Sequence, residues 1–169
     1  MPRLMSMALT VDAVRRREKN QTRRDGWWLD KNGNQILCAG DPVTLCKKVR
    51  GRRSGEPLEI LDTVTVVDVR REPLAAITLA DVAGEGFPDW TTQQFIDFFC
   101  ASHRGVTQDT EITRIEWTYP RRCRACGCTD YAACDTIFGP CAWQATYDDN
   151  TGICTACPPD ATADFADHK

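Results

Sequence analysis

Seven cysteines lie between residues 123 and 157, and thiolates at this density could bind a metal. Four of them form two C-x-x-C pairs, Cys123 with Cys126 and Cys154 with Cys157. Two such pairs are typical of structural zinc sites, in which four thiolates form a tetrahedron around the ion. The 27 residues between the pairs exceed the usual interval of about 15–20 residues. We therefore predict one Zn²⁺ ion held by these four cysteines.

The other three cysteines of this segment, Cys128, Cys134 and Cys141, leave alternatives open. They could belong to a second metal site completed by His168 or a carboxylate, or the segment could hold an iron–sulfur cluster, because soft thiolates suit both. Disulfide bonds are the last alternative, since nothing in the sequence indicates an oxidising compartment. The segment has few apolar side chains, so we expect it to need its metal in order to fold.

The first third of the sequence is basic and could contact phosphate groups. Residues 1–53 contain thirteen Lys and Arg against five Asp and Glu, whereas residues 54–169 contain eight against nineteen. Lysine and arginine release condensed counterions when they bind a phosphate backbone. The residues that we expect to face phosphates are Arg23, Arg24, Lys47, Lys48, Arg50, Arg52 and Arg53. A solvated polar surface is the alternative interpretation of these charges.

Two adjacent tryptophans, Trp27 and Trp28, follow the first of these basic runs. Aromatic rings often stack on the bases of single-stranded nucleic acids. At least one ring of such a pair usually belongs to the core, so we expect one buried ring and one that stacks on a base.

Helices that could position these residues are predicted at three places in residues 1–119. A short helix over 10–18 would place Lys19 at its end. A single helical turn is expected after Thr78, which is a good N-cap residue. A longer amphipathic helix is expected to follow a capping box formed by Thr91 and Gln94.

Strands are predicted where β-branched and alternating apolar residues occur. The most regular is 59–71, which is rich in valine and threonine. Shorter strands are expected over 42–49, after a glycine turn, and over 111–119, where apolar side chains alternate. These elements predict an α+β fold: a small, partly open β-barrel with short helices over 1–119, a Cys-rich zinc-binding module over 120–158, and a disordered acidic tail over 159–169.

Composition limits the functions that the sequence allows. The chain has 169 residues, of which 42% are apolar, so it can form one ordinary domain with a small appendage. No segment has the apolar length of a signal peptide or a membrane span, and we expect a cytoplasmic protein without a membrane partner. The phosphate loop, dinucleotide fingerprint and serine-hydrolase elbow are all missing.

Four short motifs occur in an order that resembles the ASCH domain. They are K-x-x-T-x-R at 19–24, A-G-D-P at 39–42, G-E-G-F at 84–87 and I-E-W-T at 115–118. The ASCH domain is a small β-barrel similar to the PUA fold. The resemblance implies a cleft that takes RNA, DNA or a nucleoside.

Some bacterial members of this family are amidohydrolases that remove the acyl group from N4-acetylcytidine, and the resemblance implies the same activity as a candidate function of this chain. The proposed catalytic set of those enzymes corresponds here to Lys19, Thr22 and Glu85. Such chemistry needs an activated nucleophile and a proton carrier, and Lys19 could take the Thr22 proton if burial or nearby Arg23 lowers its pKa. The alternative is that Lys19 and Glu85 only form an ion pair that holds the barrel closed.

The Cys-rich segment, with C-G-C-T at 126–129 and G-P-C-x-W at 139–143, is similar to tails of phage and prophage proteins. We expect recognition of RNA, single-stranded DNA or a modified pyrimidine nucleoside. The amidohydrolase is one alternative, and a phage protein that docks on a host protein is another.

Overall fold

The chain divides into two compact units, Met1–Tyr119 and Pro120–Lys169. We call them the barrel unit and the cysteine unit. The computed structural model describes residues 2–26 and 28–159, so Trp27, His168 and nearly all of the expected acidic tail lie outside the described residues. No helix in the described part of the chain is long and apolar enough to cross a membrane.

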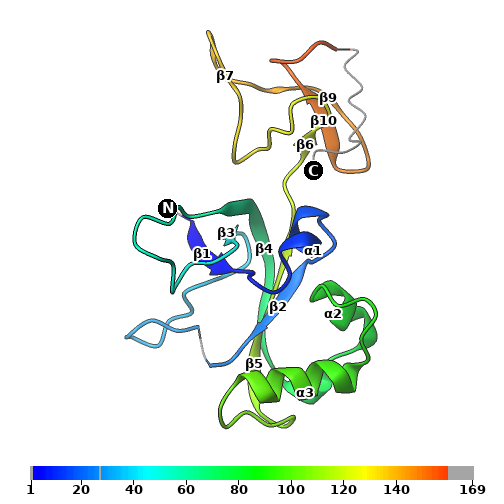
Figure 1. Ribbon diagram of the computed structural model, residues 1–169. Helices are drawn as coiled ribbons and strands as arrows, with labels where there is room; N and C mark the ends of the chain where they lie inside the picture. Colours follow the sequence, from blue (N-terminus) through cyan, green and yellow to red (C-terminus); the bar gives the residue numbers. More distant parts are fainter. Residues whose placement is uncertain (1, 27, 160–169) are drawn as a thin grey trace. The chain divides into compact units, whose positions relative to one another are not determined.

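The barrel unit is built on one five-stranded sheet (Figure 1). Its strands follow the order β1 (Arg3–Ser6), β3 (Pro42–Cys46), β4 (Ile60–Pro73), β5 (Glu111–Thr118) and β2 (Gln21–Arg24). β1 and β3 are parallel, whereas the other neighbouring strands are antiparallel. The long strand β4 pairs with β3 and with β5, and it therefore links the two halves of the sheet.

The sheet curls into a partly open barrel. The register of β4 with β5 shifts between Val66 and Asp68 of β4. Such irregularities typically bend the strand that contains them. β1 and β2 are the two edges of the sheet, and Arg24 Nη2 donates a hydrogen bond to the Ser6 carbonyl across the opening, at 2.6 Å. This architecture, followed by the Cys-rich segment, confirms the predicted α+β fold class.

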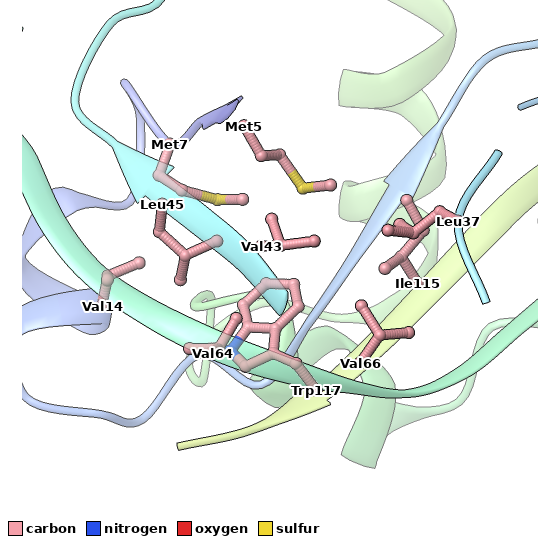
Figure 2. Close-up of a cluster of buried hydrophobic side chains, with 10 residues drawn as sticks. All are labelled: Met5, Met7, Val14, Leu37, Val43, Leu45, Val64, Val66, Ile115 and Trp117. Atoms are coloured by element: carbon pink, nitrogen blue, oxygen red, sulfur yellow. The ribbon is translucent and has the colours of Figure 1, made fainter. Parts of the chain in front are cut away.

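The barrel unit has two hydrophobic clusters, one around the helices α2 (Leu79–Gly84) and α3 (Thr92–Ser102) and one between the strands, which is shown in Figure 2. Alternate residues of β3, β4 and β5 point inward, as the two-residue period of a strand requires. Burial of each such side chain contributes about 1.5–3 kcal/mol. The cluster between the strands consists of Met5, Met7, Val14, Leu37, Val43, Leu45, Val64, Val66, Ile115 and Trp117.

The predicted strands are close to those observed. β4 starts one residue later than expected and runs two residues further, and β5 ends one residue earlier. β3 ends at Cys46 rather than at residue 49, because the following lysines lie in an exposed loop. The sequence patterns do not predict β1 or β2.

The helices α2 (Leu79–Gly84) and α3 (Thr92–Ser102) begin at the predicted caps (Figure 1). The Thr91 hydroxyl accepts a hydrogen bond from the backbone of Gln94, whose side chain accepts one from the Thr91 N–H. Thr78 caps α2 in the same reciprocal way. A single 3₁₀ turn, η1 (Leu74–Ala76), precedes α2.

The first helix is shorter than predicted. α1 spans Val11–Arg15, whereas the sequence predicts a helix to residue 18. Arg17 adopts a left-handed conformation with φ 59°, and the N–H groups of residues 18 and 19 both donate to the Ala13 carbonyl. This turn ends the helix and directs Lys19 toward the barrel.

The cysteine unit has little regular structure. β6 (Arg122–Cys123), β10 (Thr151–Cys154) and β9 (Trp143–Thr146) form a three-stranded sheet in that order, and β7 (Asp135–Thr136) pairs with β8 (Gly139–Pro140). Cysteines form the buried cluster of this unit, where a larger domain would have hydrocarbon side chains.

Candidate functional site

A pocket with a volume of about 250 Å³ opens in the barrel unit. One side is polar and comes from the segment between α1 and β2, from β2 itself and from the turn after α2. Other lining residues are aromatic and come mainly from α3. The polar side contains Lys19, Thr22, Arg23, Arg24 and Glu85.

Lys19 and Glu85 form a buried ion pair in this pocket. The Lys19 ammonium donates to the Glu85 carboxylate Oε2 at 3.1 Å and to the Glu85 carbonyl oxygen at 2.5 Å. Each side chain is only 4% exposed. A buried charge is very costly unless an opposite charge and hydrogen bonds compensate it, so each of the two ions depends on the other.

Two glycines allow Glu85 to reach this position. A Cβ atom on Gly84 would lie 2.5 Å from the Asn20 side chain and 2.6 Å from that of Gln21, so both side chains would have to move if another residue stood here. The Asn20 N–H donates to the Gly84 carbonyl at 3.0 Å. Gly86 has φ +93°, a conformation that favours glycine. The G-E-G motif therefore fixes Glu85 against the segment that carries the lysine.

Arg23 holds the carboxylates of this region together. Its guanidinium is completely buried and lies 3.3 Å from Glu85, 2.7 Å from Glu72 and 3.4 Å from Asp81. We expected Arg23 to face a phosphate, but the structure surrounds it with three carboxylates. Its charge is therefore compensated within the protein.

Burial lowers the pKa of Lys19, because the ammonium loses its hydration. The charge of Glu85 and its hydrogen bond act in the opposite direction, whereas the charges of Arg24 and Arg23 lower the pKa further. The net direction is downward. Lys19 therefore gives up its proton more readily than a surface lysine does, which is a property required of a proton acceptor.

Thr22 presents a hydroxyl without a partner. It lies in β2 opposite Ile115 of β5, and it is 5% exposed. The Thr22 hydroxyl forms no hydrogen bond to any other described residue, although it lines the pocket. It is therefore available to a ligand.

Aromatic side chains of α3, together with Phe87, line the same pocket as these polar groups. Phe95 and Phe99 stack with ring centroids 6.2 Å apart, and the His103 ring stacks on Phe99 at 4.2 Å. Phe87 lies 5.8 Å from Phe98. The sequence predicts these α3 side chains as an apolar helix face, but not as a pocket wall. The sequence signal that could have revealed the pocket is that the same helix face continues to Ser102 and His103. A face buried entirely in a core would stay apolar.

The second tryptophan of the pair is not part of this pocket. Trp28 packs partly buried against the hydrophobic core and lines a different cavity of about 220 Å³. The expectation that Trp28 stacks on a base stays a prediction, and Trp27 lies outside the described residues. The aromatic side chains that line the pocket are Phe87 and the phenylalanines of α3.

Arg24, on β2, lines the pocket and donates to the Ser6 carbonyl. The other cations expected to face phosphates lie on one exposed loop between β3 and β4. The backbone N–H of Val49 donates to the Ser6 hydroxyl at 2.7 Å, and Ser6 lines the pocket, so this loop begins at the pocket edge. We call residues 47–53 the basic loop. Its cations are Lys47, Lys48, Arg50, Arg52 and Arg53, all of them exposed.

Two of these cations already have partners. Lys47 pairs with Glu59 at 3.1 Å, and Arg52 donates to the Glu56 carbonyl at 2.9 Å. Within residues 2–26 and 28–159, Lys48, Arg50 and Arg53 form no ion pair. They are the cations of this loop that could contact a phosphate.

Asp81 makes the acid stability of this network testable. Burial opposes its ionisation, but hydrogen bonds from Thr78 and Gln21 and the charge of Arg23 outweigh burial and lower its pKa from 3.8 to about 2. Because the folded state favours the carboxylate, this group contributes about 2 kcal/mol to the free energy of unfolding above pH 4, and the contribution disappears as the pH falls toward 2.

Urea unfolding should therefore show Asp81→Asn to be less stable than the unmodified chain at pH 6, with a smaller difference at pH 3. The same change at exposed Asp12 is the control, and a difference independent of pH would contradict the prediction.

The seven cysteines of the C-terminal segment lie close together. Two groups of four have all their sulfur atoms within 4.8 Å of one another, and both groups contain Cys128 and Cys154. This arrangement suits a metal ion. The first group consists of Cys123, Cys126, Cys128 and Cys154, and the second of Cys128, Cys134, Cys141 and Cys154. The predicted set of Cys123, Cys126, Cys154 and Cys157 is neither of these groups, although Cys157 is in contact with Cys123 and Cys154.

Comparison with known proteins shows likeness in structure but not in sequence. No protein-family model and no curated protein matches the sequence. The structure is similar to that of a protein from Enterococcus faecalis V583 described as family-model DUF984, with a TM-score of 0.51 and 14% identity over 70% of this chain and 80% of the other. It is also similar to an ASCH domain from Lactobacillus crispatus JV V101, with a TM-score of 0.46 and 14% identity over 66% and 70% of the two chains. The first likeness shows a shared fold.

Proposed function

We propose that the barrel unit recognises a single modified pyrimidine base, presented as a nucleoside or at one position of a nucleic-acid strand. The observation that carries this proposal is the pocket, which is lined by aromatic side chains together with buried charged and hydroxyl groups. A base has an apolar face and a polar edge, and such a pocket matches both.

The size of the pocket favours one base over a longer ligand. Its volume of about 250 Å³ is below the roughly 300–1,000 Å³ of pockets for drug-sized molecules. The ring of the base would lie against the phenylalanines of α3. Its exocyclic substituent would face the Thr22 hydroxyl and the ion pair of Lys19 and Glu85. Because both charges of that pair are compensated, a neutral polar group suits this position better than an anion.

The basic loop supports a ligand that continues outside the pocket. Its Val49 bonds to Ser6 on the pocket edge, and four of its five cations form no ion pair with described residues. A base in the pocket would place its sugar and any phosphate near this edge. We therefore expect a strand to bind more tightly than the nucleoside at low salt, and this advantage should decrease as the salt concentration rises.

N4-acetylcytidine is the probe for this pocket. We expect binding to be detectable by calorimetry, and Thr22→Val to weaken it about fivefold to tenfold because one hydrogen bond is lost. Thr44→Val is the matched control, since Thr44 is equally buried in β3 but bonds to Thr63 outside the pocket. The proposal is wrong if neither the nucleoside nor a short RNA that contains it binds, or if Thr44→Val weakens binding as much as Thr22→Val.

Hydrolysis is a second candidate function for the same pocket. The observation that favours it is the lowered pKa of Lys19 beside the unpartnered Thr22 hydroxyl. Lys19 would accept the hydroxyl proton, Thr22 would attack the acyl carbon, and the departing exocyclic amine would take the proton back. Water would then release the acyl group from Thr22. Chromatography of the calorimetry samples decides between the functions: free cytidine that disappears with Thr22→Val indicates an enzyme, and intact ligand indicates a binding protein.

A further inference from the structure

The sulfur atoms of the cysteine unit form one cluster rather than separate pairs. The Sγ–Sγ distances are 3.7 Å for Cys126 and Cys154, 3.8 Å for Cys128 and Cys141, and 4.0 Å for Cys123 and Cys157, and a contact of 3.5 Å between Cys126 and Cys134 joins the two groups. Zinc–thiolate bonds of about 2.3 Å in a tetrahedron give an edge of about 3.8 Å between sulfurs. The thiols are therefore spaced like ligands of tetrahedral ions.

The number of sulfurs decides how many ions the cluster can hold. One tetrahedral ion uses four thiolates and would leave three thiols crowded together without a metal. Two separate ions need eight ligands, but the cysteine unit has seven cysteines. Among the described residues, no histidine or carboxylate belongs to either group of sulfurs. Two ions that share one sulfur need seven ligands. The cluster thus matches two ions with one bridging thiolate.

Cys154 is the sulfur best placed to bridge. Cys128 and Cys154 both belong to the two groups of four, and Cys154 is the more buried, at 1% exposed against 9%. Its Sγ lies 3.7 Å from that of Cys126 and 3.7 Å from that of Cys157. Because Cys157 also contacts Cys123, it can take the place of Cys128 in the first group. Cys128 is then left to the second group, and all seven sulfurs are used.

We propose that the cysteine unit binds two Zn²⁺ ions that share the thiolate of Cys154. The first ion is held by Cys123, Cys126, Cys157 and Cys154, and the second by Cys128, Cys134, Cys141 and Cys154. Zinc suits this arrangement because it prefers tetrahedral thiolate sites without an open position. In an iron–sulfur cluster, inorganic sulfide would lie between the metals and hold cysteines of different irons further apart.

Backbone hydrogen bonds to sulfur support thiolates at both ends of the cluster. The Cys154 N–H donates to the Cys123 Sγ at 3.4 Å, and the Cys134 N–H donates to the Cys141 Sγ at 3.2 Å. Such bonds offset part of the negative charge that accumulates when several thiolates surround two ions. One donor serves each proposed ion.

The first test measures the number of ions and their connection in the full chain. Native mass spectrometry should show two Zn²⁺ ions per chain. After exchange with ¹¹³Cd, the NMR spectrum should contain two resonances typical of four thiolate ligands, each split by coupling to the other ion through the shared sulfur. One ion per chain, iron with sulfide, or two resonances without coupling would each overturn the proposal.

Single substitutions test which sulfur is shared. Cys134→Ser removes a ligand of the second ion only, so the chain should retain one ion. Cys154→Ser removes a ligand of both, and any cadmium that remains bound should show no coupling. Cys38→Ser is the control, because Cys38 is an exposed thiol of the barrel unit, and it should retain two coupled ions. Coupling that survives in Cys154→Ser would contradict the assignment of the bridge.

Discussion

Replacing Glu85 with glutamine is expected to lower the free energy of unfolding of the barrel unit by about 3–5 kcal/mol. The Glu85 carboxylate contacts two buried cations, Lys19 at 3.1 Å and Arg23 at 3.3 Å. Glutamine has the same shape but no charge, so Lys19 would lose its compensating carboxylate and Arg23 would lose one of three, while the packing stays almost the same. Denaturant unfolding followed by circular dichroism measures this loss.

Glu59 provides a matched control for this prediction. It also pairs with two cations, Arg15 at 2.7 Å and Lys47 at 3.1 Å, but its side chain is 41% exposed. Surface pairs contribute about 0–1 kcal/mol, so Glu59→Gln should have little effect. Adding Lys19→Met to Glu85→Gln should restore part of the stability, because it removes the cation that the first change leaves uncompensated. Equal losses for Glu85→Gln and Glu59→Gln would show that the buried pair has no special role.

Removal of metal from the cysteine unit is expected to unfold that unit and leave the barrel unit folded. The buried cluster of the cysteine unit consists of Cys123, Cys128 and Cys154, with few apolar neighbours. Structural zinc contributes roughly 10–16 kcal/mol to the folding of small zinc-binding peptides, far more than so small an apolar core can supply. A chelator should therefore collapse the amide NMR signals of residues 121–157 toward random-coil positions.

The signals of the barrel unit serve as the internal control. Its hydrophobic core contains none of these sulfurs, so its amide shifts should stay unchanged when metal is removed. Adding Zn²⁺ back should restore the dispersed signals. Dispersed signals that persist in the metal-free chain would show that the cysteine unit folds without its metal.

The regular parts of the barrel unit were predictable because their sequence patterns are local. β4 is rich in β-branched residues, and α3 begins at a capping box whose two residues, Thr91 and Gln94, bond to each other. These signals depend on neighbours within a few positions. The C-x-x-C pairs are equally local, and the sequence predicts a metal site from them.

The strand β2 could not be predicted, because its interactions are not local. Its residues are Gln21, Thr22, Arg23 and Arg24, and none of them is apolar. Gln21 and Arg23 bond to carboxylates about sixty residues away along the chain, so their burial depends on partners that the local pattern does not reveal. For the same reason, the spacing of the seven cysteines alone does not reveal that the two groups of sulfurs share Cys128 and Cys154.

The polar character of β2 also affects how the protein behaves at high concentration. An open sheet has two edges with unpaired backbone groups, and exposed edges invite strands of other molecules to add and form aggregates. In this protein Arg24 of one edge reaches to Ser6 of the other, and β2 carries arginines in place of the apolar residues that favour fibrils. The barrel is only partly closed, and the charged strand β2 at its open edge therefore disfavours self-association.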